Sequence, residues 1–384
     1  MPHPRKPRGG YTLTEMLVVV TILVILIAAA LPTARHVMEA SKVKEASRQL
    51  QAYFAMARSR AAQTGRPCGL WIEVSPQVGG APDAAPLNPV VRQATKFFLA
   101  EVPPYYAGSV QNMLGRIRDT GTSGTNRYVF EPTMPNTSGS GPAYVVDPVE
   151  SATIISLLNL GEVFLVRFDN KGEWYQCVYN GSAFIYQKTL SGIVTFPPGG
   201  FSADNPGCVF QLVRAPRRVG NPLELTAGAC IDMSYSGMGP TDRSFNIVRN
   251  NLVILFQPSG AMAGMYVDLN YVDPNFSTVI PVYPNNPGNA FGTCHFLVGR
   301  VEKVNAPLGA NTNHPSGLNF FDPATSNLAD TASLWVSVGR QNGTVTTADN
   351  LPNLAATDYS ATGQVNYLAT ARENATNREQ TGGQ

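Results

Sequence analysis

A glutamate stands directly before the most apolar stretch of the chain. Glu15 precedes residues 16–31, MLVVVTILVILIAAAL, which carry no charge. A carboxylate is costly in lipid, by about 2.5 kcal/mol or more at the centre of a bilayer. A group of this kind is usually retained because it has a partner. The pattern therefore predicts a charge pair held in an apolar medium.

The residues around Glu15 predict insertion into a membrane. Counted from Tyr11, the apolar run would span roughly 31 Å as a helix, close to the thickness of a bilayer core. The first ten positions hold three basic residues and no acid: Arg5, Lys6 and Arg8. This asymmetry predicts a cytoplasmic N-terminus and a body outside. A secretory signal peptide cut after the alanines at 28–30, or a plain signal anchor, shares these features, but neither explains Glu15.

The segment from Gly10 to Glu15, GYTLTE, resembles the type IV prepilin processing motif. The resemblance implies that a prepilin peptidase cuts after Gly10 on the cytoplasmic side and methylates the new terminus at Tyr11. The usual residue there is Phe, so Tyr11 is a mild departure. Glu15 lies four residues after that terminus, as the family requires. Pro32 sits where many members carry a proline.

After such a cut, the amine of Tyr11 and the carboxylate of Glu15 would lie on one face of a helix. In the family, the glutamate pairs with the terminal amine of a neighbouring subunit. Since an unpaired charge is expensive in an apolar medium, the pair would fix the register of assembly. The resemblance also implies the partners: prepilin peptidase, other pilins or pseudopilins, and an inner-membrane assembly platform protein. It implies no cofactor.

A helical pattern continues through residues 33–63. One apolar stripe repeats at spacings of three and four, through Val37, Ala46, Leu50, Phe54, Ala57 and Ala61. Gly65 is suited to end the helix and Pro67 to prevent its continuation. Pro32 lies inside the helix and should kink it. A helix of about 80 Å results, which suits a filament subunit better than a monomer.

Three later segments resemble the GspH/FimT branch of minor pseudopilins. They are residues 55–67, AMARSRAAQTGRP, residues 252–260, LVILFQPSG, and residues 334–340, LWVSVGR. The branch implies a first strand after the helix, here Cys68 to Val74, with alternating apolar positions. Length is the departure, because residues 75–251 separate this first strand from the segment at 252–260, and members usually have a shorter body.

The remaining pattern predicts many short strands and long loops. Further strands are expected at Lys96–Val102, Val163–Phe168, Trp174–Tyr179, Val209–Arg214, Ile231–Met233, Met265–Leu269 and His295–Val304. Loops are expected at 75–94, 119–142 and 197–207, with a short helix at Ser109–Arg118. Residues 341–384 are polar and predict a flexible tail.

The sequence gives little support for catalysis or metal binding. No HExxH, Walker A, G-x-S-x-G or strand-linked G-x-G-x-x-G motif is present, so the chain is not expected to be an enzyme. His295 and His314 could still join a Ser-His-Asp or zinc site assembled in space. Residues 268–273, DLNYVD, could bind calcium or form a solvated turn.

Charge gives no reason to expect a nucleic-acid partner. Without the first ten residues, 25 basic side chains face 26 acidic ones. A small basic cluster could touch phosphate, as in FimT-like pilins that bind DNA, or form a solvated loop: Arg214, Arg217 and Arg218. The five cysteines form no CxxC pair and are expected as buried apolar residues, with one or two disulfides open: Cys68, Cys177, Cys208, Cys230 and Cys294.

Together these patterns predict an α+β fold, with one long N-terminal helix packed on an antiparallel β-rich domain. The expected parts are a leader (1–10), a transmembrane helix (11–32), its amphipathic continuation (33–65), a periplasmic pilin-like domain (66–340) and the tail (341–384). The expected function is that of a structural subunit of a type II secretion pseudopilus or a type IV pilus. A DNA- or surface-binding minor pilin is the alternative, and a membrane-anchored periplasmic enzyme is a third.

Overall fold

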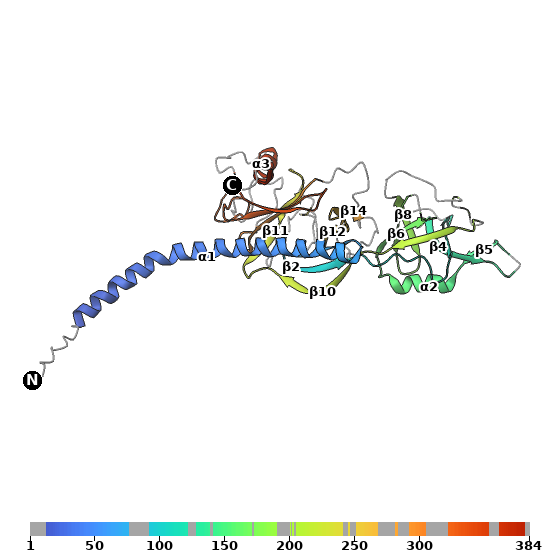
Figure 1. The fold of residues 1–384 in the computed structure, drawn as a ribbon, viewed down its shortest axis with the longest axis horizontal. Helices are drawn as coiled ribbons and strands as arrows, with labels where there is room; N and C mark the ends of the chain where they lie inside the picture. Colours follow the sequence, from blue (N-terminus) through green and yellow to red (C-terminus); the bar gives the residue numbers. More distant parts are fainter. Residues whose placement is uncertain are drawn as a thin grey trace, which may run out of the picture.

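The structure is a computed structural model, and it describes residues 13–76, 92–121, 128–138, 141–170, 173–189, 200, 202, 205–240, 245, 251–267, 281–282, 292–304, 322–352 and 361–380. It is an α+β protein in which a long N-terminal helix, α1, lies against an antiparallel sheet. α1 runs without interruption over Leu13–Thr64. Figure 1 shows it extending well beyond the sheet toward the N-terminus.

Ten strands form the main sheet. Nine follow the spatial order β14 (Pro281–Val282), β13 (Met262–Val267), β12 (Asn251–Phe256), β1 (Cys68–Pro76), β2 (Arg92–Glu101), β11 (Ala229–Met238), β15 (Cys294–Arg300), β16 (Leu334–Val338) and β17 (Val345–Asp349). The tenth, β10 (Arg217–Glu224), pairs with β2 beside β11. A 3-10 turn, η2 (Val301–Lys303), follows β15. Every pairing in the sheet is antiparallel, as predicted.

Both faces of the main sheet are covered, which explains why strands β11, β12, β15 and β16 are buried along almost their whole length. Along β1, Leu70 and Ile72 point to the core shared with α1, whereas Trp71 belongs to a second cluster on the other face. This is the period-two alternation of a strand. The predicted stripe of α1 is confirmed where its side chains are described: Leu50 and Phe54 are fully buried against the sheet.

The end of α1 also agrees with the prediction. Gly65 adopts a left-handed φ of 66° and donates its N–H to the Ala61 carbonyl at 3.0 Å. Glycine takes this conformation without a steric penalty, and the bond satisfies one of the last free carbonyls of the helix. Pro67 then precedes β1.

A second β unit is inserted between β2 and β10. Its strands are β3 (Leu114–Asp119), β4 (Tyr128–Pro135), β5 (Tyr144–Val146), β6 (Val163–Phe168), β7 (Tyr175–Tyr179), β8 (Phe184–Thr189) and β9 (Cys208–Val213). The order β3-β9-β6-β7-β8-β4 closes on itself because β3 also pairs with β4, and β5 pairs antiparallel with the end of β4. We call residues 102–216 the barrel; Figure 1 shows it at the end of the molecule opposite the N-terminus.

The barrel has a core of its own. Its interior is dominated by aromatic rings, with Phe130 in contact with four other phenylalanines at centroid distances of 5.2–6.4 Å. A short helix, α2 (Pro148–Leu157), packs against it through Ile154. The chain enters and leaves the barrel at neighbouring points, because Glu101 at the end of β2 lies opposite Arg217 at the start of β10 in the strand ladder. The barrel is thus a domain inserted at the end of a hairpin.

Several elements differ from the sequence-based expectations. The predicted helix at Ser109–Arg118 is wrong, because Leu114–Asp119 is strand β3. The predicted loop at 119–142 contains β4, whose Glu131 is buried and ion-paired to Arg116. Strands β5, β8 and β10 and helix α2 were not predicted. The expected loops at 75–94 and 197–207 lie mainly outside the described residues.

The prediction of a flexible tail at residues 341–384 is also wrong for much of that segment. Residues Val345–Asp349 form β17 at the edge of the main sheet, and Ala361–Gln380 form helix α3. α3 buries Tyr367 and Leu368 on the outer face of the sheet, beside Trp335. Its Arg372 is 1% exposed and donates to the carbonyls of Tyr235 and Gly239, each at 2.7 Å. These two bonds fasten α3 to the second half of β11 and to the residue that follows it.

Candidate functional site

The amino-terminal half of α1 carries the candidate site. Every side chain from Leu13 to Ile27 is exposed. Twelve of these are large apolar side chains with 52–83% of their surface exposed. Exposed apolar surface of this extent marks a site of contact with a membrane or with partner proteins. α1 is therefore divided into an uncovered apolar half and a half that belongs to the domain core.

Glu15 lies in the first turn of α1. The free N–H groups and the dipole of a helix N-terminus stabilise a carboxylate at this position. Val18 and Val19 follow at three and four residues, so they share a face with Glu15 and line the same shallow hollow. Whatever covers this apolar face also covers the carboxylate, which then requires a cationic or hydrogen-bonding partner.

The other predicted residues of this site are only partly described. Gly10 and Tyr11 lie outside the described residues, so the pairing of the Tyr11 amine with Glu15 stays a prediction. The backbone of Pro32 lies within α1, which continues through it to Thr64. Figure 1 shows α1 curving along its amino-terminal half without a break. A local kink at Pro32 also stays a prediction.

Polar contacts fix the carboxyl-terminal half of α1 to the body along its length. Gln49 accepts the Thr226 N–H at 3.0 Å, and the Tyr53 hydroxyl donates to the Glu224 carbonyl at 3.1 Å. Near the end of the helix, Arg60 pairs with Glu101 at 2.6 Å. With the buried stripe, these contacts make the packed half of α1 a rigid extension of the main sheet.

The histidine and serine that come closest to a catalytic pair are sealed in the interior. Nδ1 of His295 lies 2.9 Å from Oγ of Ser337, and the two residues are 2% and 3% exposed. Burial, reinforced by Arg372, lowers the pKa of His295 to about 3. The ring is therefore neutral and unreachable for a substrate, and the bond joins β15 to β16. His314 lies outside the described residues.

The basic cluster is largely neutralised. Arg217 pairs with Glu162 at 2.8 Å and Arg218 with Glu73 at 3.2 Å. Two of the three guanidiniums are thus engaged by carboxylates, which weakens the hypothesis that they bind a phosphate backbone. Sequence reasoning singled out the arginines but missed both carboxylates, because they are distant in the sequence.

Metal and disulfide chemistry gain no support from the described residues. Within them, no three His, Cys, Asp or Glu side chains are grouped as a metal site. The calcium candidate at 268–273 lies outside them. All five cysteines are described and are free thiols; four are buried and Cys208 is half-buried. The pKa of Cys177 is raised by burial, as expected for an unreactive core thiol.

Comparison with known proteins agrees with the amino-terminal pattern. Residues 5–31 match the family described as the prokaryotic N-terminal methylation motif. No curated protein and no solved structure matches the chain. Among the described residues, none of the helices combines the length and the hydropathy that a membrane crossing needs.

These observations define the class. The chain is a prepilin-like protein: it has an N-terminal methylation motif followed by a long helix, and that helix is docked by its second half on an antiparallel β-rich domain. The motif implies processing by a prepilin peptidase and assembly with pilin-like subunits.

Proposed function

We propose that this protein is a minor pseudopilin or pilin-like structural subunit of a type II secretion pseudopilus or a type IV pilus. The supporting observation is the division of α1. Its amino-terminal half exposes twelve large apolar side chains, while its other half is built into the domain core. Lipid before assembly and sister helices after assembly would cover the exposed half.

The same reasoning gives the topology. Residues 11–32 would anchor the precursor in the inner membrane, with the basic leader (1–10) in the cytoplasm and the body in the periplasm. Prepilin peptidase would cut after Gly10 and methylate Tyr11. An inner-membrane assembly platform protein would then add the subunit to the filament. Secretion across the outer membrane is the role favoured over DNA capture, because Arg217 and Arg218 are already paired.

Processing gives the most direct test. The protein is expressed with a prepilin peptidase, and the mature terminus is read by mass spectrometry. The expected product begins at an N-methylated Tyr11. Gly10→Leu should leave an uncut precursor, whereas Gly9→Leu, one position further from the cut, should be processed. A mature terminus near Ala30 would instead indicate ordinary signal peptidase and would refute the proposal.

A further inference from the structure

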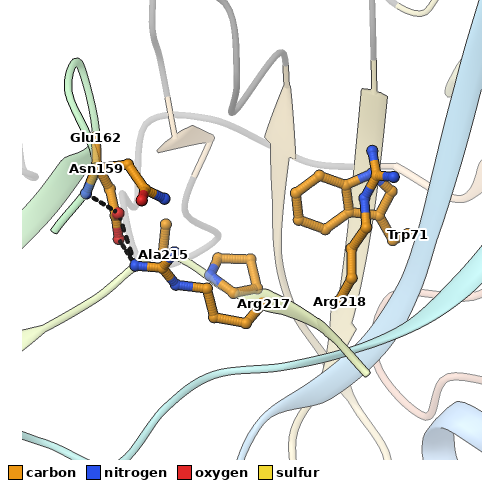
Figure 2. A pocket seen from close by; sticks show the side chains of 7 residues that line it. Trp71, Asn159, Glu162, Ala215, Arg217 and Arg218 are labelled. Atoms are coloured by element: carbon orange, nitrogen blue, oxygen red, sulfur yellow. Dashed lines mark hydrogen bonds and ion pairs between the residues drawn. The ribbon is translucent and has the colours of Figure 1, made fainter. Parts of the chain in front are cut away.

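A pocket opens where the barrel meets the main sheet. Its volume is about 190 Å³. Trp71 of β1 forms one wall; Asn159 and Glu162, between α2 and β6, and residues 215–218, which lead into β10, form the rest (Figure 2). Pockets for drug-sized ligands measure about 300–1,000 Å³. This one accepts a group the size of an amino-acid side chain.

A buried carboxylate holds the first guanidinium of the pocket. Nη2 of Arg217 donates to both oxygens of Glu162, at 2.8 and 3.1 Å, and to the Leu157 carbonyl at 3.0 Å. The backbone N–H of Asn159 donates to Glu162 at 2.8 Å. Glu162 is 4% exposed, and burial raises its pKa against the effect of these donors. Both of its oxygens are engaged, so it offers little to a ligand.

Aromatic rings hold the second guanidinium. Cζ of Arg218 lies 4.7 Å from the ring centroids of both Trp71 and Phe98. Only its Nη1 is engaged, by Glu73 at 3.2 Å, and Nε and Nη2 bond to no residue that the structure describes. The side chain remains 37% exposed. A guanidinium fixed in this way presents a planar fork of donors that matches a carboxylate.

The pocket has a surplus of donors and of positive charge. Nε1 of Trp71 and Nε of the neighbouring Arg214 are buried and bond to none of the described residues. Burial and the proximity of Arg217 lower the pKa of Arg214. Together Arg214, Arg217 and Arg218 face two carboxylates, those of Glu73 and Glu162. One positive charge is therefore left over, and unsatisfied buried donors favour a ligand that accepts hydrogen bonds.

We propose that this pocket binds a single carboxylate group, carried by the C-terminus or an acidic side chain of a peptide, or by a small free acid. Arg218 supplies the fork and the Trp71 indole the adjoining donor, while Glu162 fixes Arg217 behind them. One surplus charge matches a monoanion better than a phosphate dianion. The site belongs to the junction of barrel and sheet and does not depend on the proposed filament role.

The test observes Trp71 directly. The chain has three tryptophans, so the full-length protein in an uncharged detergent should give three indole N–H signals in a nitrogen-15 NMR spectrum, with Trp71 assigned from Trp71→Phe. The probes are acetyl-Gly-Gly as the free acid, the same peptide as the amide, acetate and inorganic phosphate. Arg218→Gln is the test variant. Lys96→Gln, which breaks an exposed ion pair between β2 and β10, is the control.

The expected result is a saturable shift of the Trp71 signal with the free-acid peptide and none with the amide. Arg218→Gln should weaken binding by about tenfold or more, as loss of a charge-assisted bond predicts, and Lys96→Gln should not. Equal affinity for acetate would identify a free acid as the ligand class, and tighter peptide binding a chain terminus. An equal response to the amide, tighter binding of phosphate, or no saturable shift would overturn the proposal.

Discussion

Truncation of Phe54 tests whether α1 is part of the domain core. Phe54 is fully buried and lies 6.2 Å from Phe256 and 5.6 Å from Phe296, measured between ring centroids. Replacing a buried Phe with Ala typically costs about 3–5 kcal/mol. That is a large part of the roughly 5–15 kcal/mol that stabilises most domains. Phe54→Ala should therefore lower the melting temperature of the main sheet by roughly 10 °C.

The assay uses a chain shortened to residues 36–384, which lacks the exposed apolar half of α1. This shortened chain should be soluble and monomeric, and circular dichroism should follow its thermal unfolding. Met56→Ala is the matched control, because Met56 lies on the same helix but is 46% exposed. Its effect should stay within about 0.5 kcal/mol.

The reasoning fails if Phe54→Ala and Met56→Ala melt alike. The stripe of α1 would then contribute no packing to the sheet, and the rigid connection between helix and body would be lost. A chain that begins after Gly65 provides an independent check. It should aggregate or fail to fold, because the inner face of the sheet would be exposed to water. Normal folding of that chain would lead to the same refutation.

Three other features of the molecule give further predictions. Glu15→Leu should leave the melting temperature of the body unchanged but should reduce crosslinking to sister subunits. Thr21→Leu, on the same exposed segment, is the control and should assemble normally. Unimpaired assembly of the Glu15 variant would contradict the pairing role. The barrel, expressed alone as residues 102–216, should unfold cooperatively, because it has a closed ring of strands and its own core; a broad, non-cooperative transition would show that it needs the main sheet. Burial raises the pKa of Asp232 to about 7, above about 3.9 in the unfolded chain, so the wild type loses stability as pH rises through this window. The free energy of unfolding of Asp232→Asn should therefore rise relative to that of the wild type by up to about 1.4 kcal/mol per pH unit in this window. Urea unfolding at pH 4.5 and 7.5 measures this difference. A difference that does not change with pH would argue against the raised pKa of Asp232.

The parts predicted well from sequence are those specified by local patterns. The buried stripe through Leu50 and Phe54 repeats at helical spacing, and Gly65 marks where that helix ends. Strand β1 alternates as expected. In each case the residues that determine the structure lie within a few positions of one another, so no knowledge of distant contacts is needed.

The barrel was predicted only in part. Strands β6, β7 and β9 confirm the predictions at Val163–Phe168, Trp174–Tyr179 and Val209–Arg214, whereas β3 and β4 were missed because their buried polar residues have partners that are distant in the sequence. Glu131 interrupts the apolar pattern of β4, yet it is buried between Arg116 and Arg118 of β3. Helix α2 had a readable signal: Asp147 accepts the N–H groups of residues 149 and 150, and Pro148 occupies the first turn. That signal was overlooked within a segment rich in turn-forming residues.

Helix α3 was missed for a related reason. Its apolar stripe is short, and its attachment depends on Arg372, which would be expected on the surface from its residue type. The carbonyls of Tyr235 and Gly239, more than a hundred positions earlier, accept its hydrogen bonds and explain its burial. Polar residues that are satisfied by distant backbone groups cannot be recognised as core residues from local sequence.

The backbone pairing of Glu101 on β2 with Arg217 on β10 has an evolutionary consequence. Because the chain leaves and re-enters the main sheet at neighbouring positions, residues 102–216 could be gained or lost in one event without shifting the register of any strand in the main sheet or moving α1. Selection could then change the inserted domain at its own pace while α1, the helix proposed to make the filament contacts, stayed under separate constraint. An unusually long body would therefore be compatible with the same packing of α1 as a short one, and related chains could carry different domains, or none, in the same hairpin.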